Sequence, residues 1–229
     1  TDMQPDLVWI KNRETTDAHC IFDSVRGATK VMHSNVHDGE TTDTDTLDSF
    51  TSDGFQVDAD VKVNTNAEKY VAWCWKAGTS FTNDASATSV GSIDSTGSIS
   101  TDNGFGIISW TGTGVDATIA HGLGVAPKIV FVKNRSATNN WRSSFTIADG
   151  SYDYAHINAT DGKSDEPVSA PTSSVFSVYE HAQANGDGND MIAYVFAEKQ
   201  GFSKFGAYEG NGNADGTFIY TGFRPAFVM

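Results

Sequence analysis

The sequence predicts an all-β protein made of tandem antiparallel β-sandwich repeats, of the jelly-roll or lectin-like kind. Its apolar stretches are short, rich in β-branched and aromatic residues, and separated by Gly, Asn, Asp and Ser. No window keeps the i, i+3, i+4, i+7 apolar spacing of an amphipathic helix over three turns. A third observation, an internal repeat, sets the architecture.

The repeat is clearest in one predicted strand. Pro5–Arg13 reads PDLVWIKNR, and Pro127–Arg135 reads PKIVFVKNR, at an offset of 122 residues. The same pattern begins again at Pro225. Proline is tolerated at the first position of a strand, and the Lys-Asn-Arg end is expected in solvent. One strand-forming unit is therefore used more than once.

Further predicted strands recur at an offset of 121. Tyr70–Trp75 matches Met191–Phe196, and the short strand around Phe55 matches the one around Phe176. Aromatic and β-branched character is kept at matched positions, for example at Trp9 and Phe131 or Trp73 and Tyr194, as a shared core would demand. We therefore expect matched aromatic residues to occupy equivalent places.

These matches divide the chain into four parts. The first β repeat covers residues 1–78 and is truncated at its N-terminal side; the second covers 105–198. Residues 79–104, rich in Ser, Thr and Gly, are interpreted as a linker or long loop with at most a short edge strand. Residues 199–229 begin a third repeat, because Tyr208–Gly212 matches Trp110–Gly114 at an offset of 98. This last part could complete the first repeat by strand addition, in the same chain or from a neighbour.

The composition limits the classes of partner. The formal net charge of −14 argues against binding to nucleic acid or to anionic membranes, which needs clustered Lys and Arg. No run of about 18 apolar residues predicts a membrane span, and no signal peptide is visible. The acidic surface favours solubility; the alternative is cation binding. Two cysteines, Cys20 and Cys74, do not form a disulfide framework.

No catalytic constellation is visible. His121, between turn residues in His-Gly-Leu-Gly, is the best single suspect, but no nucleophile motif or partner accompanies it. The histidines lack zinc-ligand spacing, and no pair of carboxylates is singled out as a glycosidase would need. We therefore expect a protein that is not an enzyme.

Aromatic side chains at strand ends and in loops are the candidate ligand-binding residues. They could stack on sugar rings through their apolar faces. The four candidates are Trp141, Tyr152, Tyr154 and Tyr179. Packing in the core is the alternative fate for each of them.

A calcium site is the one cofactor considered. The segment Asn-Gly-Asp-Gly-Asn-Asp at residues 185–190 is dense in oxygen ligands, with Asp187, Asn189 and Asp190 as the candidates. It does not fit the twelve-residue calcium loop with a closing Glu. A turn closed by Asx side chains is the alternative, and it looks the same in sequence.

The chain resembles the repeat found in tail-fibre-like virion structural proteins of marine bacteriophages. The resemblance spans most of the chain and rests on Pro5–Arg13, Phe22–Gly27, Ser52–Phe55, Tyr70–Gly78, His121–Pro127, Gly201–Gly206 and Gly222–Pro225. It implies a β-rich structural or adhesive module with no catalytic residues to carry over. The second repeat departs from the pattern, because it lacks a counterpart of Asp23–Gly27.

The expected function is therefore that of a non-enzymatic virion module, in a tail fibre or surface appendage. It would attach to host surface glycans or to other virion proteins, and we expect it to form homo-oligomers, for example trimers. The alternative is a bacterial secreted or cell-surface carbohydrate-binding adhesin. A polysaccharide-degrading enzyme is the least favoured interpretation. Variable polar loops on constant strands motivate the binding hypotheses.

Overall fold

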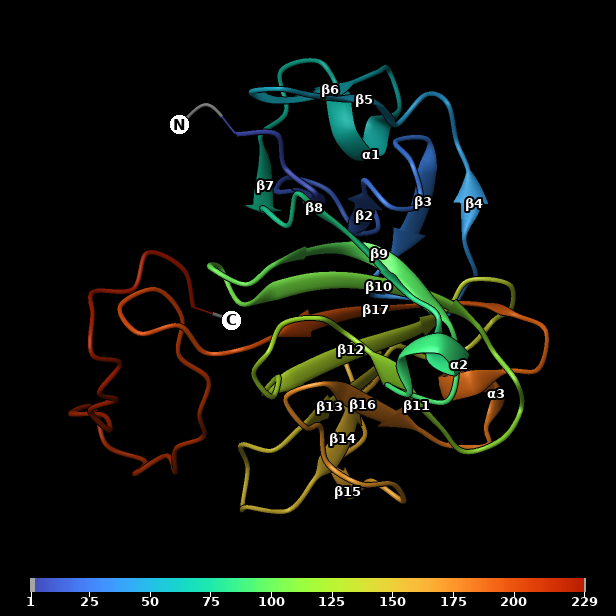
Figure 1. Cartoon of the computed structure of the whole chain (residues 1–229). Helices are drawn as coiled ribbons and strands as arrows, with labels where there is room; N and C mark the ends of the chain where they lie inside the picture. The colour runs from blue at the N-terminus through green and yellow to red at the C-terminus, as the bar shows by residue number, and fades with distance from the viewer. Residues whose placement is uncertain (1–2, 229) are drawn as a thin grey trace.

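The computed structural model confirms the all-β prediction, with about 37% of residues in strands and 5% in helices. It describes residues 3–228, so residues 1, 2 and 229, at the outer ends of the first and third predicted repeats, lie outside the described residues. Several antiparallel sheets are stacked in layers as in a β-sandwich, without closing into a barrel (Figure 1). No helix in the described part of the chain is long and apolar enough to cross a membrane.

The first repeat forms a five-stranded antiparallel sheet in the order β4-β3-β2-β1-β7. A hairpin of β5 and β6 and the one-turn helix α1 cover one face of this sheet. The bounds are β1 Leu7–Asn12, β2 Cys20–Asp23, β3 Lys30–His33, β4 Thr41–Thr42, β5 Leu47–Thr51, β6 Gly54–Val57, α1 Val61–Asn64 and β7 Tyr70–Trp75. A buried cluster that includes Val8, Phe22 and Leu47 fills the space between the sheet and the hairpin.

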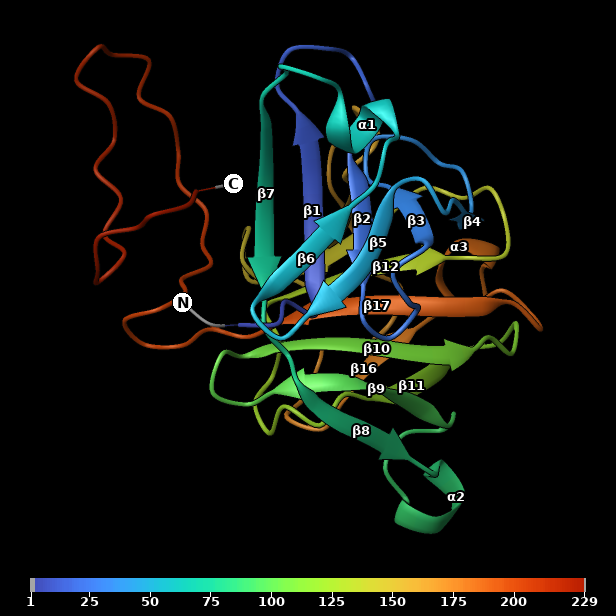
Figure 2. The same cartoon turned by 90° about the horizontal axis from the view of Figure 1, so that it is seen from above.

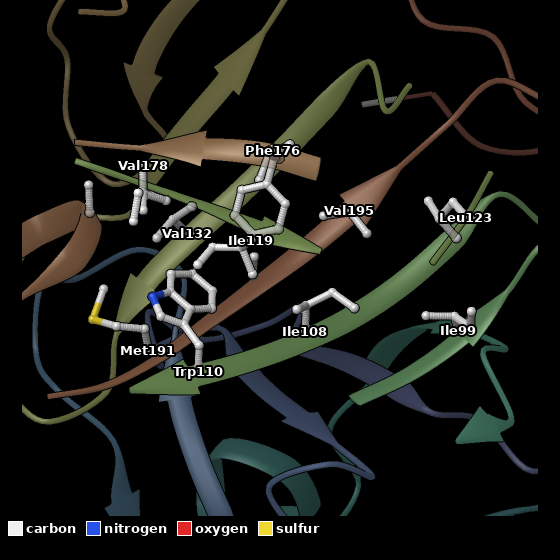
Figure 3. Close-up of a cluster of buried hydrophobic side chains, with 14 of the residues drawn as sticks. Ile99, Ile108, Trp110, Ile119, Leu123, Val132, Phe176, Val178, Met191 and Val195 are labelled. Carbon is white, nitrogen blue, oxygen red and sulfur yellow. The ribbon is translucent and has the colours of Figure 1, made fainter. Parts of the chain in front are cut away.

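The second repeat forms the larger sheet, with eight strands in the order β15-β14-β13-β12-β17-β10-β9-β8. The two-stranded sheet β11-β16 and the one-turn helix α3 cover its outer face. The bounds are β8 Thr79–Asn83, α2 Ala85–Thr88, β9 Ser95–Ser100, β10 Phe105–Thr111, β11 Ala117–Ala120, β12 Ile129–Asn134, β13 Arg142–Phe145, β14 Asp153–His156, β15 Ser164–Asp165, β16 Val175–Val178, α3 Ala182–Asn185 and β17 Asp190–Phe196. Figure 3 shows the core under this face, where Trp110 meets Phe176 at a ring-centroid distance of 5.7 Å.

The two repeats share one strand register. β1 pairs antiparallel with β2 and β7, and β12 pairs in the same way with β13 and β17. Trp9 stands opposite Trp73, and Phe131 stands opposite Tyr194. The aromatic positions matched in sequence therefore occupy equivalent places, on the same face of their sheets.

The interpretation of residues 79–104 as a linker is wrong. These residues form β8, α2 and β9, and both strands extend the large sheet beyond β10. Their composition does not indicate strands, because Ile99 is a single buried apolar residue among Ser and Thr. Gly97 allows the backbones of neighbouring strands to approach closely. A Cβ atom at Gly97 would lie 1.9 Å from the Ile107 carbonyl oxygen. A strand built from such residues lacks the apolar alternation that indicates strands in sequence.

The predicted start of a third repeat forms no strand among residues 199–228. Its only ladder contact is a bridge between Lys199 and Ser203. In Figure 2 this red segment runs next to β7 at the side of the molecule. The expected strand addition within the chain is therefore not seen in this structure.

The two large sheets pack face to face and share one core. Figure 2 shows that their strands run in different directions, with β1 and β7 across the direction of β10 and β17. The first repeat contributes Leu7, Ile21 and Met32, and the second contributes the larger share of the buried cluster, which is Phe105, Ile107, Phe131, Trp141, Ile192 and Tyr194. Each large sheet is thus covered on both faces, once by its own small layer and once by the other repeat.

Polar contacts, most of them buried, join the two repeats to one another. The Tyr194 hydroxyl donates to Asp23 at 2.6 Å, and the Asp23 carboxylate also pairs with the buried Arg26. Arg135 donates to Glu40 at 2.9 Å. The buried ammonium group of Lys133 donates to the His37 carbonyl at 3.1 Å. The Asp-Ser-Val-Arg-Gly motif, present only in the first repeat, therefore has a structural role at this interface.

We predict that both repeats unfold in one cooperative transition, because neither large sheet can keep its inner face covered alone. Trp141→Ala should lower the free energy of unfolding by about 3–5 kcal/mol, the usual cost of removing a buried large aromatic side chain. Differential scanning calorimetry should show a single endotherm that moves as a whole. Two endotherms, with only one of them shifted by the substitution, would contradict the shared core.

Burial of Lys133 predicts a gain in stability at alkaline pH. Desolvation lowers the pKa of Lys133 in the folded protein to about 8, whereas its ordinary value is 10.5. The cost of burying the charge is fully present below pH 8 and is relieved as the pH rises towards 10.5, because the unfolded chain then binds more protons. The stability of the wild type relative to Lys133→Met should rise by up to about 3 kcal/mol over this window. Urea titrations from pH 7 to 10.5 measure it, and a flat difference would refute it.

Candidate functional site

A buried ion pair lies between the large sheet of the second repeat and the layer that covers its outer face. Arg142, at the start of β13, makes a two-point contact with Glu166, which follows β15, at 2.8 and 2.7 Å. The Arg142 side chain is 3% exposed and that of Glu166 is 2% exposed. The Ser144 hydroxyl donates to the same carboxylate. Two-point contacts of this kind fix orientation as well as charge.

Tyrosine rings enclose the Arg142 guanidinium group. Its central carbon lies 3.3 Å from the ring centroid of Tyr154 and 4.6 Å from that of Tyr179. Cations are attracted to the faces of aromatic rings at these distances. Tyr152 lies next to the pair, and its backbone carbonyl accepts a hydrogen bond from the Glu166 amide. Burial, and then the charge of Glu166, raises the pKa of the Tyr152 hydroxyl, so this group stays neutral.

A polar rim continues from the cluster towards the surface. Arg142 donates to the Gln183 side-chain oxygen at 3.2 Å, and Gln183 in turn contacts His156. The other ring nitrogen of His156 lies 3.2 Å from a carboxylate oxygen of Asp161. His181 stacks on Tyr179 with a centroid distance of 5.4 Å. The rim therefore offers hydrogen-bonding groups next to partly exposed rings.

The structure brings together three of the four aromatic residues singled out in the sequence. Tyr152, Tyr154 and Tyr179 are partly exposed and gather around the Arg142–Glu166 pair. Trp141 does not belong to this group, and its assignment as a ligand-binding residue is wrong. It is 1% exposed, stacks on Tyr194 in the core between the repeats, and donates to the His33 carbonyl at 2.8 Å. Consecutive side chains along a strand alternate between faces, which separates Trp141 from its neighbour Arg142.

Arg142 and Glu166 are the residues that the sequence reasoning missed, although the repeat carries the signal. In the shared register, Arg142, Ser144 and Tyr154 correspond to Cys20, Phe22 and Val31 of the first repeat. Those three residues belong to the apolar core of the first repeat. At these matched positions the first repeat has apolar residues and the second repeat has polar or aromatic ones. This difference could have indicated the cluster from the sequence.

The calcium candidates Asp187 and Asn189 lie in the turn between α3 and β17, and Asp190 is the first residue of β17. The Gly188 amide donates to the Gly112 carbonyl, and the Gly112 amide donates to the Asn189 carbonyl, both at 2.9 Å. Asp187 and Asp190 are exposed. Between residues 3 and 228 there is no group of three or more His, Cys, Asp or Glu side chains that could hold a metal ion. The backbone bonds favour the alternative of a structural turn, and a calcium site stays a prediction.

His121 also has a structural place. It is fully buried; its Nε2 lies 3.2 Å from the Thr172 carbonyl, and its Nδ1 accepts from the Leu123 amide at 3.2 Å. Burial lowers the pKa of His121, so the ring is neutral near pH 7. Both ring nitrogens are therefore used in joining a turn after β11 to the loop before β16.

The fold and this cluster define the class of the protein: a repeat protein with two antiparallel β-sandwich units packed against one another. The chain belongs to a family described as a domain of unknown function (DUF7483), whose model matches residues 1–229. No curated protein and no solved structure matches the chain in the same comparisons.

The ion pair predicts a strong asymmetry between single and double substitutions. Arg142→Met should destabilise the protein by about 3–5 kcal/mol, because it leaves the buried Glu166 carboxylate without its partner. The double variant Arg142→Met with Glu166→Leu should recover most of this loss, since apolar residues fill the same layer in the first repeat. Guanidinium unfolding of all variants measures both effects. A double variant as unstable as the sum of the single variants would contradict the analysis.

Proposed function

We propose that this chain is a non-enzymatic virion module of a bacteriophage, from a tail fibre or surface appendage, that attaches to host surface glycans. The proposal rests on one observation above all. Two repeats keep the same sheet register, yet only the second has a charged and aromatic cluster where the first has an apolar core. A polar and aromatic cluster at positions that are apolar in the other copy supports a binding role for that place.

The chemistry of the cluster suits a sugar. Tyr154 and Tyr179 present partly exposed rings, whose apolar faces can stack on the faces of pyranose rings. The exposed carboxylate of Asp161 and the Nε2 atom of His181 at the rim can hydrogen-bond to hydroxyl groups. The buried Arg142–Glu166 pair holds the rings in place from below, so less conformational entropy is lost on binding. Anionic surfaces suit the acidic chain poorly, which favours neutral glycans as ligands.

A glycan array followed by titration calorimetry tests the proposal. Tyr179→Ala should weaken binding to the recognised glycan at least tenfold, because it removes a stacking face, whereas Tyr179→Phe keeps the face and should retain most of the affinity. Val61→Ala is the control, since Val61 is 57% exposed and lies in α1 of the first repeat. Equal binding by wild type and Tyr179→Ala, or no binding by the wild type to any glycan or host cell, would contradict it.

A further inference from the structure

The outer edge of β7 has no partner strand. Within residues 3–228, β7 pairs only with β1. Its counterpart β17 pairs with β12 on one side and with β10 on the other. The first repeat therefore presents a row of free backbone donors and acceptors where the second repeat has a strand. Open edges of this kind are templates for pairing with another chain.

A segment with the sequence features of the missing strand lies elsewhere in the chain. In the alignment that matches Tyr208 to Trp110, residues 203–209 correspond to β10. This segment is unpaired in the structure apart from the bridge at Ser203. An unpaired edge and an unpaired strand of matching type therefore occur in one molecule.

The last part of the chain is also unusually apolar on its surface. Eleven large hydrophobic residues are exposed between residues 3 and 228, and seven of them lie between residues 202 and 228; these are Phe202, Tyr208, Phe218, Ile219, Tyr220, Phe227 and Val228. Phe227 already rests on the edge region of the first repeat, with its ring centroid 5.7 Å from that of Trp73 and 6.3 Å from that of Trp75. Such a concentration of exposed apolar side chains marks an interaction site.

We propose that residues 203–209 of a second copy of this chain add to the free edge of β7, in the register that β10 keeps with β17. In its own chain the segment is held elsewhere, because Phe205 packs on Phe196 with a centroid distance of 6.4 Å. When two copies exchange this segment, the free edge of β7 and residues 203–209 each gain a strand partner. The same addition buries Tyr208, which is 68% exposed in the single chain.

The register of β10 with β17, applied to residues 203–209 and β7, gives compatible pairs of side chains. Phe105 stands opposite Phe196 and Thr111 opposite Asp190, so the matched pairs are Ser203 with Trp75 and Glu209 with Lys69. The second of these pairs places opposite charges across the strands, which stabilises a sheet. Tyr208 stands opposite Tyr70, as Trp110 stands opposite Met191. This pairing extends the core of the first repeat at its open side.

A native cysteine makes the register testable. Gly106 pairs with Val195, so the addition places Lys204 opposite the exposed Cys74. Opposed residues on antiparallel strands are close enough for a disulfide bond. Mild oxidation of the full-length Lys204→Cys variant should give a covalent dimer or larger species on non-reducing gels. Ala207→Cys is the matched control, because its side chain lies on the other face and should give little product. Cys20 is buried, which raises its pKa to about 12 and keeps it unreactive.

The outcomes separate the alternatives. A cross-linked monomer with altered mobility would mean that the segment pairs with its own chain, and no cross-link would mean that the edge stays free; both overturn the proposal. An independent measurement is the mass in solution by light scattering. Gly206→Pro removes a ladder donor, because residue 206 matches Ile108, whose amide faces β17, and it should convert the oligomer to monomer. Asp215→Pro, outside the segment, should leave the oligomer intact. A wild-type chain that is monomeric at about 100 μM, far above the concentration needed for a micromolar complex, would also overturn it.

Discussion

The structure depends on the packing of the two large sheets against one another. A sheet with apolar residues on both faces must be covered on both sides. Each repeat covers only one face of its large sheet with its own residues. The other repeat provides the second cover, through the cluster around Ile107, Ile192 and Leu7. This constraint explains why Val8 and Ile10 face one core while Leu7 faces another. It also explains why the polar contacts of Asp23 with Tyr194 cross between repeats rather than staying within one.

The two repeats differ both at the shared interface and in the outer layers. Trp9 and Phe131 keep an aromatic side chain that faces the other repeat. Ile21 and Met32, in the same shared core, match the small residues Ser143 and Ala155. The outer faces of the large sheets do not contact the other repeat, because each is covered by short elements of its own repeat. There the second copy has Arg142 and Tyr154 where the first has Cys20 and Val31. The two repeats therefore differ on both faces of their sheets, and the Arg142–Glu166 pair is the main change in the outer layer.

Much of the fold could be predicted from the sequence because the repeat supplies an internal comparison. Matched aromatic residues such as Trp73 and Tyr194 gave the correct strand register. The strands at residues 79–83 and 95–100 could not be found, since Ser, Thr and Gly satisfy a sheet edge without an apolar alternation. Trp141 was misplaced because a strand position alone does not say which face is open. Three tyrosines of the site were found, but the ion pair beneath them needs three-dimensional proximity between β13 and the end of β15.

The buried Arg142–Glu166 pair carries an energetic cost that the first repeat avoids. Taking both charges out of water is expensive, and replacing a buried pair with apolar residues is often neutral or stabilising. The first repeat shows that this fold accepts the apolar solution, since Cys20, Phe22 and Val31 form a packed core at the same positions. Stability therefore does not account for the pair. What the pair does provide is orientation: a planar guanidinium fixed at two points holds Tyr154 and Tyr179 at set distances. Rings held in this way form a pre-organised surface, which a packing role alone does not require.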